Sequence, residues 1–370
     1  MLPPPGGRFL ALDGLRGVAA LLVLVFHAFW NTADSEFMRE QLPELVVLST
    51  GFLRSGVAVF FVISGFVIAY TTRSLHTGDQ AWRFIVRRQV RLDPPYYAMI
   101  AVALIIEGVQ ALIPGLVHAT FTPGEVLLNM LYLQGIVGVP SVLAVAWTLC
   151  LEVQFYLVVV IVALGATRLS RSPETRTGIQ VGVVVALMLL SLTFGLVGVP
   201  PGPWVLGTWW MFAIGMILAW FVAGLIRLWL VYAALATLLV WGIGMSLVGR
   251  ADPWGGEWFA IATAMLVAFL VLSRLLGRSP GTVMLYFGRI SYSLYLAHLP
   301  VLIVVSGIVV KLLPDSFVAR LAGLVISVAA AICAAHILYH TVEKRAVAWS
   351  KRVPRSKHDV IDPPRGATTD

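Results

Sequence analysis

Charged residues are scarce in this chain of 370 residues. Only 12% of them are Asp, Glu, Lys or Arg, about half of the share in an average soluble domain. Hydrophobic residues make up 59%, and the mean hydropathy is +0.91. A composition this apolar excludes an ordinary soluble domain and predicts a polytopic protein of the inner or plasma membrane.

Cysteine is also rare, and several well-known motifs are missing. The two cysteines, Cys150 and Cys333, lie in apolar runs, which argues against a disulfide framework or a cysteine metal site. There is no P-loop, no GxSxG elbow and no DNA-binding signature. No small-residue cleavage site follows the first apolar run, so we expect no cleavable signal peptide. We therefore interpret the formal net charge of +8 as a topology signal, not as affinity for nucleic acid.

Ten apolar runs approach the length of about 20 residues that a helix needs to cross hydrocarbon. They lie at 9–30, 50–71, 95–113, 146–167, 179–198, 204–224, 227–248, 257–275, 291–310 and 320–340. A shorter apolar stretch at 126–139 is predicted to be re-entrant or interfacial. The predicted fold is thus all-α and membrane-integral, with about ten transmembrane helices.

The loops between these runs alternate in charge. The loop 31–49 carries four acidic residues and one arginine, whereas the loop 72–94 carries five arginines and two aspartates. The loops 168–178 and 274–290 and the tail after 340 are basic as well. Positive loops face the cytoplasm, so we expect both termini there. We expect residues 1–345 to form the membrane domain and 346–370 to be a disordered basic or polar tail.

The first span contains an arginine and a histidine eleven residues apart, Arg16 and His27. At 100° per residue, both side chains point to the same side of a helix, about 16 Å apart along its axis. Ionisable groups within a membrane are costly and usually mark a functional path. This stripe predicts a reaction channel.

Glu152, in the fourth span, is predicted to lie about as deep as His27. A carboxylate beside an imidazole could orient the ring for general-base activation of a hydroxyl. The alternative is a buried His–Glu pair that only holds two helices together.

A basic segment at 83–97 precedes the third span. Arg88 and Arg91 share one helical face, and guanidinium groups bind phosphates in a bidentate manner. The segment could therefore bind the phosphates of a nucleotide-like donor; from composition alone, contact with anionic lipid headgroups is the stronger interpretation. Pro94 and Pro95 are expected to end this helix.

Two further spans, the second and the ninth, carry polar candidates. Ser64 and Gly65 could line a channel, although helix packing is the default role of small residues. Tyr292 and Tyr295 suit a membrane interface. His298 lies deeper, and we give equal weight to a second catalytic group and to a histidine that bridges helices.

His336, His340 and Glu343 have metal-ligand spacing on one helical face. Polar residues are expected at that end of the last span in any case, so a metal site is the weaker interpretation and we predict none.

Five motifs in order resemble the membrane-bound acyltransferase type 3 family. They read LDGLRGVAALLVLVFH, FFVISGF, RRQVRLDPPYY, WTLCLEVQFYL and GRISYSLYLAH. With the ten spans, the resemblance covers residues 8 to about 345. It implies transfer of an acyl group, commonly acetyl, from cytosolic acyl-CoA to a hydroxyl on a cell-envelope glycan or related molecule.

The resemblance also implies roles for individual residues. Arg16 and His27 match the family's functional R-x10-H motif, and Arg88 and Arg91 match an R-x-x-R motif associated with the donor. Glu152 matches the glutamate of W-x-L-x-x-E, which begins at Trp147.

We therefore expect an acyl-CoA-dependent O-acyltransferase in which His27 acts as base and Glu152 orients it. Arg16, Arg88, Arg91 and Ser64 are expected to contact the donor, and direct transfer is favoured over an acyl-enzyme on Ser64. Expected partners are acyl-CoA (acetyl-CoA first), a carbohydrate-containing acceptor and membrane lipids, without metal or nucleic acid. A proton- or anion-coupled transporter is the alternative, and a non-catalytic scaffold is a more remote one.

Overall fold

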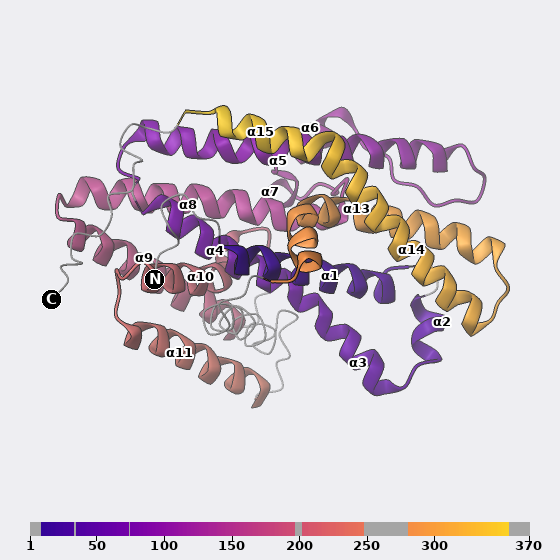
Figure 1. The fold of residues 1–370 in the computed structure, drawn as a ribbon, viewed down its shortest axis with the longest axis horizontal. Helices are drawn as coiled ribbons and strands as arrows, with labels where there is room; N and C mark the ends of the chain where they lie inside the picture. Colours follow the sequence, from indigo (N-terminus) through magenta and orange to yellow (C-terminus); the bar gives the residue numbers. More distant parts are fainter. Residues whose placement is uncertain (1–8, 33–34, 74, 197–201, 248–279, 355–370) are drawn as a thin grey trace.

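The computed structural model describes residues 9–32, 35–73, 75–196, 202–247 and 280–354. Every regular element within these ranges is a helix (Figure 1). Nine helical stretches in them are long and apolar enough to cross a membrane. They confirm nine of the predicted spans, while the span predicted at 257–275 lies outside the described residues.

The long helices are α1 (Leu10–Trp30), α4 (Gly56–Thr72), α5 (Gly78–Ala111), α8 (Trp147–Leu169), α9 (Pro173–Leu196), α10 (Trp209–Val222), α11 (Leu228–Leu247), α13 (Thr282–Leu312) and α14 (Phe317–Leu338). The short ones are α2 (Ser35–Glu40), α3 (Glu44–Phe52), α6 (Pro123–Met130), α7 (Gln134–Val137) and α15 (Lys344–Arg352). Three 3₁₀ turns (Leu53–Ser55, Ala144–Ala146, Val205–Thr208) and a π-helical turn (Tyr339–Glu343) join or extend them.

Glycines let two pairs of helices approach to backbone contact. Between α4 and α10, a Cβ on Gly65 would overlap the backbone of Phe212, and a Cβ on Gly215 would overlap α4 in the same way. Between α1 and α13, Gly17 and Gly288 face each other's helices without room for a side chain. Small residues at such crossings are the usual means of packing helices in lipid. These two crossings fix α1, α4 and α13 around the site described below.

The proline pair does not end a helix, contrary to the sequence-based prediction. α5 runs without a break from Gly78 to Ala111 and includes Pro94 and Pro95. Proline is tolerated in membrane helices where neighbouring helices support the backbone. Here α13 packs beside α5, and the hydroxyl of Tyr292 donates a 2.8 Å hydrogen bond to the carbonyl of Leu92.

Two other predicted boundaries are refined. The apolar stretch 126–139 is too short to span, as predicted, and forms the short helices α6 and α7. Beyond residue 345, where we expected the tail to begin, α15 continues to Arg352 and packs along α5. Residues after 354 lie outside the described part of the chain.

The connections between long helices gather at two opposite ends of the bundle (Figure 1). The connections after α4, α8 and α10 lie at one end, and those after α1, α5 and α13 lie at the other. This alternation is the arrangement expected of helices that cross a membrane in successive directions.

Candidate active site

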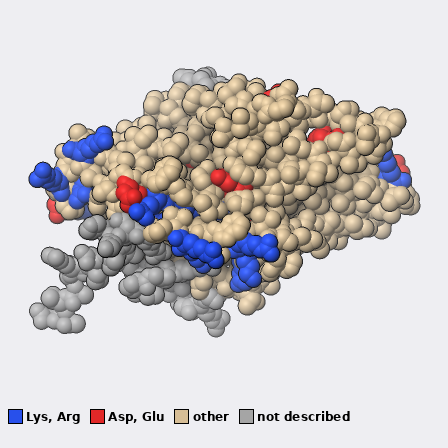
Figure 2. Space-filling view, turned by 90° about the horizontal axis from the view of Figure 1, so that it is seen from above, with Lys and Arg blue, Asp and Glu red and all other residues tan. Residues whose placement is uncertain are grey.

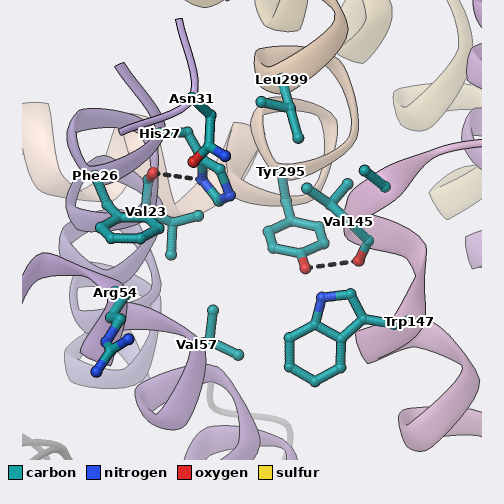
Figure 3. A pocket seen from close by; sticks show the side chains of 11 residues that line it. Val23, Phe26, His27, Asn31, Arg54, Val57, Val145, Trp147, Tyr295 and Leu299 are labelled. Carbon is teal, nitrogen blue, oxygen red and sulfur yellow. Dashed lines mark hydrogen bonds between the residues drawn. The ribbon is translucent and has the colours of Figure 1, made fainter. Parts of the chain in front are cut away.

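The imidazole of His27 lines a cavity of about 330 Å³ near the end of α1 (Figure 3). We call it the His27 cavity. Its other walls include Phe26 of α1, Trp147 at the start of α8 and Tyr295 of α13. In Figure 3 the His27 ring points toward the space between α1 and Tyr295. The sequence-based candidates His27, Trp147 and Tyr295 therefore meet in one place.

A second histidine, His298, contacts the ring of His27. The Nδ1 atom of His27 lies 2.9 Å from the carbonyl oxygen of Val23 and 3.2 Å from Nε2 of His298. The centroids of the two rings are 4.9 Å apart. His298 is 1% exposed, and its own Nδ1 lies 3.0 Å from the carbonyl oxygen of Leu294. The two histidines thus join α1 to α13.

Glu152 does not pair with His27, contrary to the sequence-based hypothesis. Its carboxylate accepts a 2.8 Å hydrogen bond from Ser64 and another from the hydroxyl of Tyr156. Counting residues from helix ends estimates depth but not the direction in which a side chain points. In the fold, Glu152 faces α4, so it shares a smaller cavity with Arg16 and Ser64.

This smaller cavity, the Glu152 cavity, has a volume of about 50 Å³ and adjoins the His27 cavity. Val57 and Tyr295 line both. The hydroxyl of Tyr295 lies 2.7 Å from the Thr148 hydroxyl and donates a 2.9 Å hydrogen bond to the carbonyl of Val145. The two cavities therefore lie side by side, with Tyr295 in the wall of both.

Arginines gather at the far side of the Glu152 cavity. The guanidinium of Arg88 lies over the ring of Tyr156, 5.2 Å from its centroid. Arg91 interacts electrostatically with both Arg16 and Arg88. Two motifs that lie more than 70 residues apart in the sequence, by the numbering, thus converge in space. Among the described residues, the buried Nε atoms of Arg16 and Arg91 have no hydrogen-bond partner.

Glu343 is a member of this cluster that the sequence did not place there. It is 2% exposed and lies on the π-helical turn between α14 and α15. Its carboxylate accepts hydrogen bonds of 3.1 Å and 2.5 Å from the backbone N–H and the hydroxyl of Ser293, and it attracts Arg91. π-helical turns often mark functional sites, but the sequence contains no signal for one.

The same placement removes the basis for a metal site at this end of α14. Glu343 points into the protein, whereas His336 and His340 are exposed. The Nδ1 atom of His336 instead lies 2.7 Å from the hydroxyl of Tyr286, within hydrogen-bond distance. Within the described ranges, no three metal-ligating side chains come together.

The chain matches the acyltransferase-domain family over residues 9–339. The chain belongs to this acyltransferase family. As a family member with nine spanning helices in its described part, it is a multi-pass membrane protein.

Three relatives illustrate the family. The putative membrane-bound transacylase BcsY from Komagataeibacter xylinus is 29% identical over 95% of this chain and 86% of its own length. Acyltransferase MdmB from Streptomyces mycarofaciens is 32% identical over 42% of this chain and 39% of its own length. Peptidoglycan O-acetyltransferase OatA from Listeria monocytogenes is 27% identical over 52% of this chain, which covers 29% of that protein. No solved structure matches the chain.

Proposed function

We propose that this acyltransferase moves an acyl group, acetyl first among the candidates, from cytosolic acyl-CoA to a hydroxyl of a cell-envelope glycan or glycosylated metabolite. One observation carries the proposal. A potential base, His27, lines one of two adjoining cavities, and Arg16 of a half-buried arginine cluster lines the other. Acyl transfer between two compartments requires this combination, with phosphate binding at one end and activation of a hydroxyl at the other.

The arginine end suits the phosphates of the donor. Guanidinium groups form strong charge-assisted hydrogen bonds with phosphate oxygens. The buried Nε atoms of Arg16 and Arg91 have no partner among the described residues, so their hydrogen-bonding capacity would be satisfied by an anionic ligand that reached them. Arg88, held over Tyr156, stands beside them.

Charge on the surface supports a cytoplasmic location for this end. Lys and Arg side chains gather on the face shown in Figure 2, mostly toward the end at which α8 is joined to α9. The connections at that end include Arg73, Arg171 and Arg227. The opposite connections carry Glu36, Glu40 and other acidic residues. By the positive-inside rule, acyl-CoA would reach the arginines from the cytoplasm.

The proposed reaction takes place in the His27 cavity. The imidazole of His27 removes the proton from the acceptor hydroxyl as its oxygen attacks the carbonyl carbon of the thioester. The new C–O bond forms, the C–S bond breaks, and the proton passes from His27 to the departing thiolate of CoA. Tyr295 and Trp147 form walls of this cavity, and Glu152 and Ser64 flank the route of the donor.

The relatives support a hydroxyl-bearing glycan as acceptor. OatA is named a peptidoglycan O-acetyltransferase, and BcsY a putative membrane-bound transacylase. The proposed acetyl group and the glycan acceptor follow the name of OatA, and the name of BcsY supports only acyl transfer at a membrane. The cavity that contains His27 is wide enough, at about 330 Å³, for a sugar-sized group to approach the imidazole.

The test is transfer of radiolabelled acetyl from acetyl-CoA into envelope material by membranes that contain the wild type, His27→Ala or His336→Ala. His336 is a matched control because it is exposed and lies outside both cavities. We expect full label with the wild type and His336→Ala, and a residual amount, lower by about a hundredfold or more, with His27→Ala at equal protein levels. Equal label in all three would refute the role of His27. Acceptor movement across the membrane without label would favour a transporter instead.

A further inference from the structure

If His27 is the base of the reaction, as in the proposed function, its contact with His298 affects how the base works. We propose that His298 is a positioning residue that fixes the tautomer of His27, so that Nε2 of His27 carries the lone pair facing the acceptor. His298 itself does not line the His27 cavity and is 1% exposed. It therefore acts through His27 and not on the substrate.

Two backbone carbonyls determine where the protons lie. A carbonyl oxygen can only accept a hydrogen bond, so the ring nitrogen that faces it must carry a proton. The Nδ1 atom of His298 faces the carbonyl of Leu294 at 3.0 Å and therefore carries one. In a neutral imidazole the other nitrogen, Nε2, then has a free lone pair. This lone pair of His298 faces His27.

The same reasoning applies to His27. Its Nδ1 atom faces the carbonyl of Val23 at 2.9 Å and Nε2 of His298 at 3.2 Å. Both neighbours are acceptors, so a single proton on Nδ1 serves both in a shared hydrogen bond. The proton of neutral His27 is thereby held on Nδ1. Its Nε2 atom is left unprotonated, as a general base requires.

The arrangement also stabilises the charge that the reaction creates. When Nε2 of His27 takes the proton of the acceptor hydroxyl, the ring becomes a cation. Its Nδ1–H then donates to two preorganised acceptors, which lose no freedom at that moment. The proton on Nε2 later passes to the leaving thiolate, and both histidines return to the neutral state. A carboxylate fills this supporting position in other enzymes; here it is filled by an imidazole and a carbonyl.

The alternative is that His298 only bridges α1 and α13. A matched control separates the two roles, because Leu302 is fully buried in the same contact between α1 and α13 and packs with Leu24 and Ala28. Leu302→Ala removes packing from this contact while both histidines are retained. The test compares it with His298→Ala and with His298→Gln, whose amide oxygen can accept from Nδ1–H of His27.

The assay measures kcat and KM for acetyl-CoA on the solubilised full-length protein. We expect His298→Ala to lower kcat by about tenfold to hundredfold with KM changed less than about twofold, because an orienting group contributes to the base-catalysed step and not to donor binding. His298→Gln should recover a large part of the loss, and Leu302→Ala should retain kcat.

A double variant provides a second readout. If His298 acts only through His27, adding His298→Ala to His27→Ala costs no further activity. A further loss in the double variant would overturn the inference, as would equal kcat values for His298→Ala and Leu302→Ala or a loss that falls on KM. These results leave the proposed function intact. That function fails separately, if the wild type transfers no acetyl from acetyl-CoA.

Discussion

The hydroxyl of Ser64 donates a 2.8 Å hydrogen bond to the carboxylate of Glu152, which joins α4 to α8 at the Glu152 cavity. Tyr156 donates to the same carboxylate oxygen. The carboxylate is thus surrounded by donors and by the nearby arginines, and it belongs to the part of the route that we assign to the donor. Its position there explains why it is not the partner of His27.

Ser64→Ala tests whether this serine is a nucleophile. Because we expect direct transfer from acyl-CoA to the acceptor, loss of the hydroxyl should leave the acetyl-transfer rate within about tenfold of the wild type. The hydrogen bond to a carboxylate contributes on the order of 1.5–3 kcal/mol to stability, so thermal unfolding in detergent should shift downward. Ser291→Ala is the control, since Ser291 lines the same cavity and donates to the carbonyl of Gly288. Complete loss of transfer, together with an ester-linked acetyl group on wild-type Ser64, would instead establish an acyl-enzyme.

Arg88→Ala tests the binding of the donor. If Arg88 contacts phosphate, removing one charge-assisted contact should raise KM for acetyl-CoA about tenfold or more with a smaller effect on kcat. Arg83→Ala is a matched change one turn earlier on α5, where Arg83 forms a 2.6 Å ion pair with Asp79. We expect KM to stay within about twofold in that variant, because exposed ion pairs contribute little. Equal KM values for the two variants would place the donor phosphates elsewhere.

Gly288→Ala tests the crossing of α1 and α13. A Cβ at this position would overlap the backbone of Asp13, so the two helices must separate. We expect a loss of stability of about 1–3 kcal/mol or more, measured by thermal unfolding in detergent, and a loss of transfer because His27 and His298 lie across the same contact. Gly307→Ala on α13 is the control, since nothing lies within 4 Å of its Cβ. Unchanged unfolding in both variants would contradict the close crossing.

His76 lies in the connection between α4 and α5. We expect it to make the stability of this connection depend on pH. Partial burial and the guanidinium of Arg176 lower the pKa of His76, and its Nδ1 accepts a 3.0 Å hydrogen bond from Arg176. Because the pKa is lower in the folded than in the unfolded state, the contact stabilises the fold above about pH 6.5 and is lost as the pH falls through the folded pKa.

Hydrogen exchange provides the measurement. Amide protection in residues 75–77 should decrease between about pH 7.5 and 5.5 in the wild type. In His76→Gln, an amide oxygen can accept from Arg176 without titrating in this range, so protection should not change over the same interval. A decrease of the same size in both proteins would show that another group is responsible.

The sequence was sufficient for those features that depend on composition along one helix. Span lengths follow from apolar runs, because a helix in hydrocarbon must satisfy its own backbone and bury its side chains in lipid. The common direction of Arg16 and His27 follows from helix geometry alone. The prediction that Pro94 and Pro95 end a helix was wrong because the effect of a proline within a membrane helix depends on the neighbouring helices, which the sequence of one helix does not contain.

The partners of each polar residue required the tertiary structure. A single sequence fixes the depth of a side chain approximately, but the rotation of one helix against another depends on packing, such as the backbone contact at Gly17 and Gly288. That packing brings His298 to His27, turns Glu152 toward Ser64 and brings Glu343 to Arg91. The sequence by itself therefore determined which groups lie within the membrane domain, and the tertiary structure decided which of them touch.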